Sequence, residues 1–327
     1  MIKSIFYLNG ETKSDLTLDE IKAALKQNEG VLWVDLVETS YAESENILLE
    51  VFNFHPLAIS DALDEEHVPR VDDWGDYLYL ILHSIKFDLT HEQVLETNEL
   101  DVFLGKHFLV TYQNVAIPVV DKVRQNIERD ARFLQRGADH LFYKLADDLV
   151  AETLTVVDRM DDAIDRVEDL MFKSSNQAIL EQIFTLKRSL LHLRRTLMPQ
   201  REVFNKLARG DDHVIDAQER VFFRDIYDHM VRLYDISESL RDLISGALET
   251  YLSVINNRMN EVMKTLTIIT TLFMPISFLT GFFGMNFFAA DRPFLAWTSE
   301  PIFIVVLSIF VILPVGMFVW MRSRKWM

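Results

Sequence analysis

A stripe of small, polar and methionine side chains runs along an apolar stretch near the carboxyl end. Its members, spaced by three or four residues, are Asn260, Met263, Thr267, Thr270, Met274, Ser277, Gly281 and Gly284, with Leu266 at its border. This spacing predicts one face of a helix. Such a face can pack closely against other helices, or it can line a water-filled path with Met263, Leu266 and Met274 as apolar constrictions.

No histidine, cysteine, aspartate or glutamate lies between Lys264 and Asn286. A dehydrated Zn²⁺ would therefore find none of its usual protein ligands in this stretch. The stripe ends at Gly284-Met285-Asn286, a tripeptide whose amide and carbonyl oxygens can accept hydrogen bonds. As a bare string the tripeptide is weak evidence, so its position in the chain has to carry the interpretation.

Two charge-free runs stand near the carboxyl end: Leu266 to Met285, with 20 residues, and Pro301 to Met321, with 21. A bilayer core of about 30 Å needs about 20 residues of helix, so each run is long enough to span it. Since two spans cannot enclose a pore, the pore interpretation requires a closed ring of identical subunits. Residues 286–300 between the runs are too few for a domain.

Basic residues predict the orientation of the two spans. Arg322, Arg324 and Lys325 follow the second span directly, and the positive-inside rule places them in the cytoplasm. Residues 1–257 are then cytoplasmic, with both termini on that side, and 287–300 face outside. The first residues lack the apolar core of a signal peptide.

Charge is distributed unevenly along the 327 residues. The net charge is −17, residues 258–327 carry +3, and residues 1–257 therefore carry −20. Such a field repels nucleic acid and attracts cations, although acidity also serves solubility alone. The chain has no cysteine, which excludes disulfides, thiolate metal sites and cysteine nucleophiles.

The soluble part changes character midway. Residues 1–115 mix strand-like runs (31–36, 77–87 and 107–113) with helical ones (17–27 and 44–53), which predicts an α/β domain. Residues 116–257 read as long helices: 138–173, 176–208, and one from about Asp216 that continues into the membrane. We expect a pore segment at 258–285, an external loop at 286–300, a second span at 301–321 and a basic tail at 322–327.

Several runs together resemble the CorA family of magnesium transporters. They are NEVMKTLTIITTLFMPISFLTGFFGMNF (260–287), HPLAISDAL (55–63), VPRVDDWGDYLYLIL (68–82) and FFRDIYDH (222–229). The resemblance covers essentially the whole chain. It implies a homopentamer in the plasma membrane of a bacterium or archaeon, with a cytoplasmic funnel of long helices, admitting Mg²⁺ and often Co²⁺ or Ni²⁺.

The resemblance also implies a role for Gly284, Met285 and Asn286 as the selectivity filter. Mg²⁺ dehydrates reluctantly and usually keeps several waters. A ring of Asn286 amide oxygens and Gly284 carbonyls can accept hydrogen bonds from those waters, because glycine lets the backbone approach closely. Asn260, Met263, Leu266, Thr270, Met274, Ser277 and Gly281 would line the path below, and Arg322, Arg324 and Lys325 would form a basic ring near its exit.

Regulation by cytoplasmic Mg²⁺ is a further implication of the resemblance. Asp61 would face Asp225 of the next subunit across a bound ion, with Asp147 and Glu249 as further candidates. Facing carboxylates repel each other until a cation bridges them. The family usually has an acid where this chain has Ser60, so the resemblance leaves a second ion at that interface open.

Other functions are less well supported. The acid-rich segment 147–169 is typical of a solvated helix face, the histidines show no ligand spacing, and neither a catalytic motif nor a phosphate-binding loop is present. We therefore expect a transporter without an organic cofactor rather than an enzyme. A zinc transporter of the ZntB kind remains an alternative, because residues 287–290 lack the acids common in magnesium members. A membrane-anchored Mg²⁺ sensor or scaffold is the alternative from another class.

Overall fold

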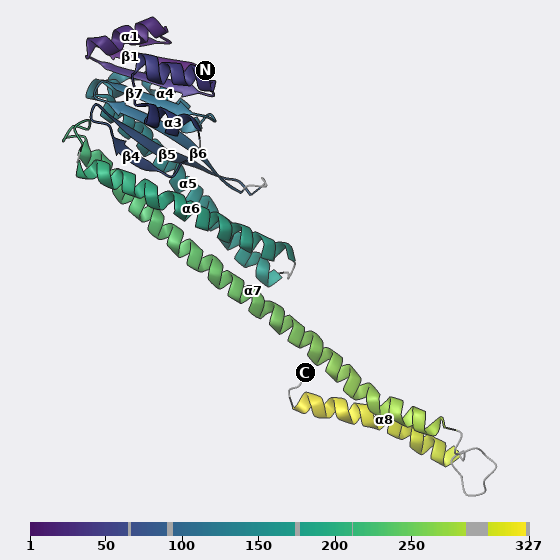
Figure 1. Ribbon diagram of the computed structural model, residues 1–327. Coiled ribbons are helices and arrows are strands. Elements are labelled where there is room, and N and C mark those ends of the chain that lie inside the picture. The colour runs from purple at the N-terminus through teal and green to yellow at the C-terminus, as the bar shows by residue number, and fades with distance from the viewer. Residues whose placement is uncertain (65–66, 90–93, 174–176, 211, 286–299, 325–327) are drawn as a thin grey trace. The chain divides into compact units, whose positions relative to one another are not determined.

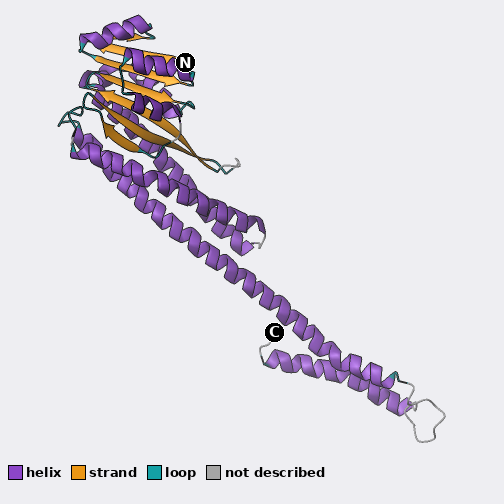
Figure 2. Cartoon of the chain, viewed as in Figure 1, coloured by secondary structure: helices purple, strands orange, loops and turns teal. Residues whose placement is uncertain are grey.

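Strand β3 (Val31–Val37) is buried at every residue. A strand of this kind must be covered on both faces. In the computed structural model it lies near the middle of a seven-stranded sheet ordered β2-β1-β3-β7-β6-β5-β4, in which β3 and β7 are parallel and all other neighbours are antiparallel (Figure 2). The model describes residues 1–64, 67–89, 94–173, 177–210, 212–285 and 300–324.

Strands and short helices are interspersed through the first part of the chain (Figure 1). The strands are β1 (Ile2–Leu8), β2 (Glu11–Ser14), β3, β4 (Arg70–Asp73), β5 (Tyr77–Phe87), β6 (Leu95–Gly105) and β7 (Phe108–Gln113). The helices are α1 (Leu18–Gln27), α2 (Tyr41–Asn46), the π-helical η1 (Ile47–Val51), α3 (Pro56–Asp64), α4 (Pro118–Arg129) and the 3-10 helix η2 (Ala131–Arg136). The predicted α/β domain is thus confirmed.

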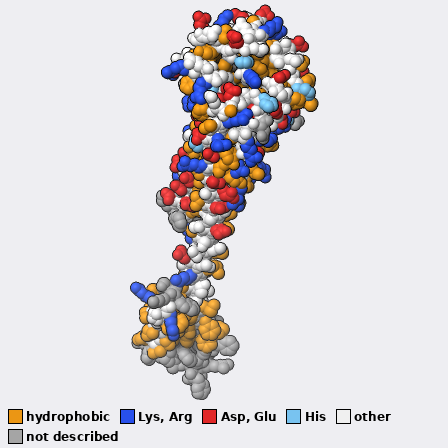
Figure 3. All heavy atoms as spheres, turned by 90° about the vertical axis from the view of Figure 1, so that its left-hand side faces the viewer, with side chains coloured by type: hydrophobic (Ala, Val, Ile, Leu, Met, Phe, Trp, Pro, Cys, Tyr) orange, Lys and Arg blue, Asp and Glu red, His pale blue; other side chains and the backbone are white. Residues whose placement is uncertain are grey.

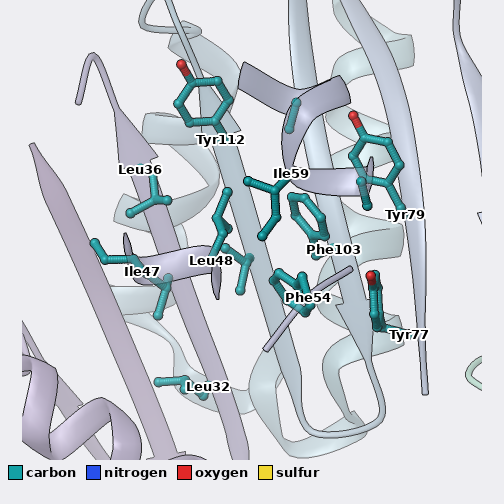
Figure 4. Close-up of a cluster of buried hydrophobic side chains, with 14 of the residues drawn as sticks. Leu32, Leu36, Ile47, Leu48, Phe54, Ile59, Tyr77, Tyr79, Phe103 and Tyr112 are labelled. Atoms are coloured by element: carbon teal, nitrogen blue, oxygen red, sulfur yellow. The ribbon is translucent and has the colours of Figure 1, made fainter. Parts of the chain in front are cut away.

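One face of the sheet is covered by α1, η1 and α3. Phe54 and Phe103 stack with ring centroids 4.4 Å apart in this layer, Leu48 and Ile59 lie beside them, and Ile47 belongs to the same cluster (Figure 4). The opposite face is covered by α5 (Ala138–Lys173), with α4 packed on α5 and α6 (Gln177–Arg209) reaching β4 to β6. Both faces of β3 are thereby removed from water.

The long helices follow the predicted boundaries closely. The expected helices 138–173 and 176–208 correspond to α5 and α6. The third was expected from about Asp216, but α7 begins at Arg220 and runs for 64 residues to Phe283. Asp216 lies in the preceding turn, where its carbonyl accepts from the amides of Glu219 and Arg220.

The chain forms two compact units, Met1–Glu249 and Thr250–Met327, and α7 belongs to both. The second unit contains the end of α7 and α8 (Glu300–Ser323). Both helices are long and apolar enough to cross a membrane. The expected boundary between the cytoplasmic helical region (116–257) and the pore segment (258–285) stays a prediction.

A buried carboxylate lies on β6 of the first unit. Asp101 is 2% exposed and accepts a hydrogen bond of 2.6 Å from the Tyr79 hydroxyl. Burial, and next the charge of Glu99, raise the pKa of Asp101 well above its usual value, while the Tyr79 hydroxyl opposes this rise. The folded protein therefore keeps this proton at pH values where the unfolded chain has released it.

Such a group makes stability fall as pH rises from about 4, the usual aspartate pKa, to the raised folded pKa. Asp101→Asn cannot ionise, and its side-chain oxygen still accepts from Tyr79. We expect thermal unfolding of the full-length variant in detergent to occur at a higher temperature than that of wild type, with a difference that grows between about pH 5 and about pH 8. Exposed Asp19→Asn is the control, and a pH-independent difference would contradict the assignment.

Candidate functional site

The first apolar span is the last part of α7. Its threonine hydroxyls bond back to the helix: Thr267 Oγ1 donates to the Met263 carbonyl at 2.8 Å, and Thr270 Oγ1 to the Leu266 carbonyl at 2.7 Å. These side chains are therefore satisfied without an external partner, as an apolar medium requires. Figure 3 shows hydrophobic side chains gathered over the described residues of the spans.

The stripe predicted from the sequence is exposed along its whole length in the single subunit. The exposed members are Asn260, Met263, Leu266, Thr267, Thr270, Met274, Ser277, Gly281 and Gly284. Met274, for example, is 66% exposed. We call these nine residues the open face.

The other side of the span packs toward α8. The half-buried residues of α7 here are Ile268, Thr271, Leu272, Pro275, Ile276 and Leu279, and the covered residues of α8 are Val306, Phe310, Leu313, Pro314, Met317 and Met321. Each set follows helical spacing, and at about 100° per residue the α7 set lies roughly opposite the open face. The second span therefore leaves the open face uncovered.

One edge of the open face borders a hollow of about 440 Å³. Met317 of α8 lines it together with Thr267, Thr270 and Met274. The hollow marks where α8 comes nearest to the open face, and most of that face remains free for another chain or for water.

Gly284 follows the end of α7. Its amide donates to the Thr280 carbonyl at 2.9 Å, and a Cβ at this position would lie only 2.9 Å from the same oxygen. A side chain here would therefore displace the backbone. Met285 is exposed, whereas Asn286 lies outside the described residues.

Asp61 is partly exposed on α3 and has partners within its own subunit. The Arg70 guanidinium donates to Asp61 Oδ2, and His67 Nε2 lies 4.0 Å from Asp61 Oδ1. Arg70 also donates from Nε to Asp72 Oδ2 at 3.0 Å. Asp61 is therefore already neutralised in the single chain. Ser60, where the family usually has an acid, donates instead to Asp64 Oδ2 at 2.5 Å.

Asp147 on α5 and Asp225 on α7 both act on the Tyr143 hydroxyl. Burial raises the pKa of Tyr143 most, and the negative charges of Asp147 and, less strongly, Asp225 raise it further. Asp147 accepts from Lys144 at 3.1 Å, while Asp225 is exposed and has no ion pair among the described residues. Glu249 is exposed further along α7.

Among the described residues, no three histidine or acidic side chains converge closely enough to hold a metal ion. Asp61, Asp225, Asp147 and Glu249 thus do not form a cation site within one subunit.

The basic residues that follow the second span are only partly described. Arg322 and Arg324 are exposed at the end of α8, and Lys325 lies outside the described residues. Their predicted position around a pore exit depends on other subunits and stays a prediction.

Arg70 is the functional candidate that the sequence did not reveal. It stands within VPRVDDW, a run that carries the family resemblance, yet nothing in that run indicates which carboxylate it contacts. Arg70 at the start of β4 contacts Asp61 of α3, and the alternation of β4 places Asp72 on the same side as Arg70.

Comparisons with known proteins agree on one family. The family model described as "CorA-like Mg2+ transporter protein" matches residues 28–324. The cobalt/magnesium transport protein CorA of Thermotoga maritima is 33% identical, over 90% of this chain and 83% of the relative. The zinc transport protein ZntB of Yersinia enterocolitica is 25% identical, over 83% of this chain and 81% of the relative.

The solved structures include the complete CorA magnesium transporter of Methanocaldococcus jannaschii. It matches with a TM-score of 0.83 and 22% identity, over 100% of this chain and 99% of that one. At this identity the match shows the fold, which is an α/β domain with a long helix and two candidate membrane helices.

Proposed function

The chain belongs to the CorA-like Mg²⁺ transporter family, whose members are divalent-cation transporters and not enzymes, and we propose that it admits hydrated Mg²⁺ through a gated homopentameric channel. Co²⁺ and Ni²⁺ are further expected cargo. The membrane is the plasma membrane of a bacterium or archaeon, with both termini in the cytoplasm. No organic cofactor and no nucleic acid takes part.

The open face of α7 is the observation that carries this proposal. A helix that only anchors the protein would not require small and polar side chains on the side facing away from α8, because such side chains interact poorly with lipid. Identical subunits arranged around an axis bring these faces together around water. The number five comes from the family resemblance.

The cation enters at the ring of Gly284, Met285 and Asn286. Neutral oxygen acceptors can accept hydrogen bonds from the waters that Mg²⁺ keeps. A ring of carboxylates would bind the ion more tightly, whereas conduction needs sites weak enough to release it. Met263, Leu266 and Met274 supply apolar constrictions that close the path by dewetting. Asn260, Thr270, Ser277 and Gly281 line the wider parts between and beyond them.

The membrane potential drives entry. A divalent cation moving inward gains roughly 4.6 kcal/mol per ~100 mV, twice the value for a single charge. The −20 charge of residues 1–257 attracts cations to the cytoplasmic side. Arg322, Arg324 and Lys325 form a local basic ring near the exit.

Cytoplasmic Mg²⁺ closes the channel by bridging subunits. Asp61 of one subunit faces Asp225 of the next, and Asp147 is a further candidate because its charge and that of Asp225 both act on Tyr143. Glu249 is a candidate for a further ion lower on α7. Loss of the ions leaves like charges facing each other, which loosens the interface.

Zn²⁺ is the alternative transported ion, since a zinc transport protein, ZntB, is among the relatives. The absence of histidine, cysteine and carboxylate side chains between Lys264 and Asn286 favours Mg²⁺ over Zn²⁺. A sensor or scaffold that binds Mg²⁺ without conducting it is the alternative from another class, and the open face argues against it.

Isotope flux into proteoliposomes tests both alternatives. We expect uptake of ²⁸Mg with little uptake of ⁶⁵Zn, and a loss of at least about tenfold in ²⁸Mg uptake for Asn286→Ala, because the acceptor ring is removed. Asn257→Ala makes the same change below the spans and should transport normally. Zinc uptake without magnesium uptake would replace the proposed cargo, and absence of any flux would favour the sensor.

Closure by internal Mg²⁺ is tested with Asp225→Lys. A lysine at this position repels the bridging ion, so current through the reconstituted variant should persist at about 1 mM internal Mg²⁺, where wild type closes. Asp235→Lys makes the same charge change elsewhere on α7 and should close normally. Normal closure of Asp225→Lys would remove the regulatory role assigned to this residue.

A further inference from the structure

Asp61 lies between two positively charged or titratable neighbours of its own chain. Arg70 contacts one carboxylate oxygen, and His67 approaches the other at 4.0 Å. Both oxygens of the Asp61 carboxylate therefore already have a neighbour, Arg70 or His67, when a divalent cation binds. The ion must displace the guanidinium or share the carboxylate with it.

Arg70 is in turn shared between two acids. Its terminal nitrogen contacts Asp61, while its Nε lies 3.0 Å from Asp72 Oδ2. The side chains of Arg70 and Asp61 are each 36% exposed, and that of Asp72 is 43% exposed. Exposed pairs of this kind are weak and exchange readily. Arg70 can therefore leave Asp61 while Asp72 retains it.

We propose that Arg70 is an internal competitor for the cation at Asp61 and that Asp72 sets how strongly it competes. The inference rests on the proposed regulatory role of Asp61. When the cation is absent, Arg70 neutralises Asp61. When the divalent cation arrives, its double charge holds the carboxylate and Arg70 withdraws to Asp72.

Competition of this kind sets the concentration at which the channel closes. The apparent affinity for the cation equals the intrinsic affinity multiplied by the fraction of time that Asp61 is free of Arg70. An exposed ion pair is strong enough to change that fraction by about two- to fivefold. The pair thus moves the closing concentration upward without contributing a ligand to the cation.

Two substitutions are expected to shift closure in opposite directions. Arg70→Gln removes the competitor and should lower the internal Mg²⁺ concentration for half-closure by about two- to fivefold. Asp72→Asn leaves Arg70 with Asp61 as its one acidic partner among the described contacts, and should raise that concentration. The double variant should behave as Arg70→Gln, because Asp72 acts only through Arg70.

The measurement is current through the full-length channel in planar bilayers, titrated with Mg²⁺ on the cytoplasmic side. Arg132→Gln is the matched control: it removes an exposed arginine of η2 that pairs with the neighbouring Asp130, and should leave half-closure unchanged. A role of Arg70 in structure alone would shift Arg70→Gln and Asp72→Asn in the same direction. That result, or an unshifted Arg70→Gln, would overturn the inference.

The outcome also separates this inference from the proposed function. Wild type that closes with Mg²⁺, together with Asp225→Lys that does not, upholds the regulatory site. An unshifted Arg70→Gln in that setting overturns the competition alone. Wild type that stays open at all internal Mg²⁺ concentrations overturns the regulatory site, and the competition with it.

Discussion

The covering of α7 by α8 on one side only is the constraint on which the rest of the account depends. Two helices cannot shield all sides of a membrane span, and the side that α8 covers is the apolar one opposite the open face. In a bilayer, small and hydroxyl side chains gain most from contact with other helices or with water. In the proposed homopentamer, further copies of the chain would supply that contact.

The continuity of α7 ties the proposed sensing and conducting residues to one element. The helix runs from Arg220 to Phe283, so Asp225 near its start and the open face near its end lie on one continuous helix. If subunits meet at Asp225 as proposed, that helix is the element through which a change at the contact would act. The Arg70–Asp61 pair proposed to adjust closure lies on α3 and β4.

Sequence reasoning succeeded where a single physical signal dominates. The two charge-free runs predicted both spans, and long helical periodicity predicted α5, α6 and the unbroken α7. Strands β1, β2, β4 and β6 were not predicted, because they are short or half-covered and carry polar residues. The helical run 44–53 is divided in the structure, since α2 gives way to the π-helical η1 at Ile47. The contact of Arg70 with Asp61 joins two different elements, β4 and α3, and no periodicity encodes such a contact.

The absence of native cysteine allows the central claim, that the open face borders water, to be measured at single positions. Ser277→Cys places a thiol on the open face, and Ile276→Cys places one at the same depth on the side toward α8. A membrane-impermeant thiol reagent, applied from outside at low internal Mg²⁺, should block current through Ser277→Cys and leave Ile276→Cys unaffected. Equal modification of both variants, or of Ile276→Cys alone, would contradict the account.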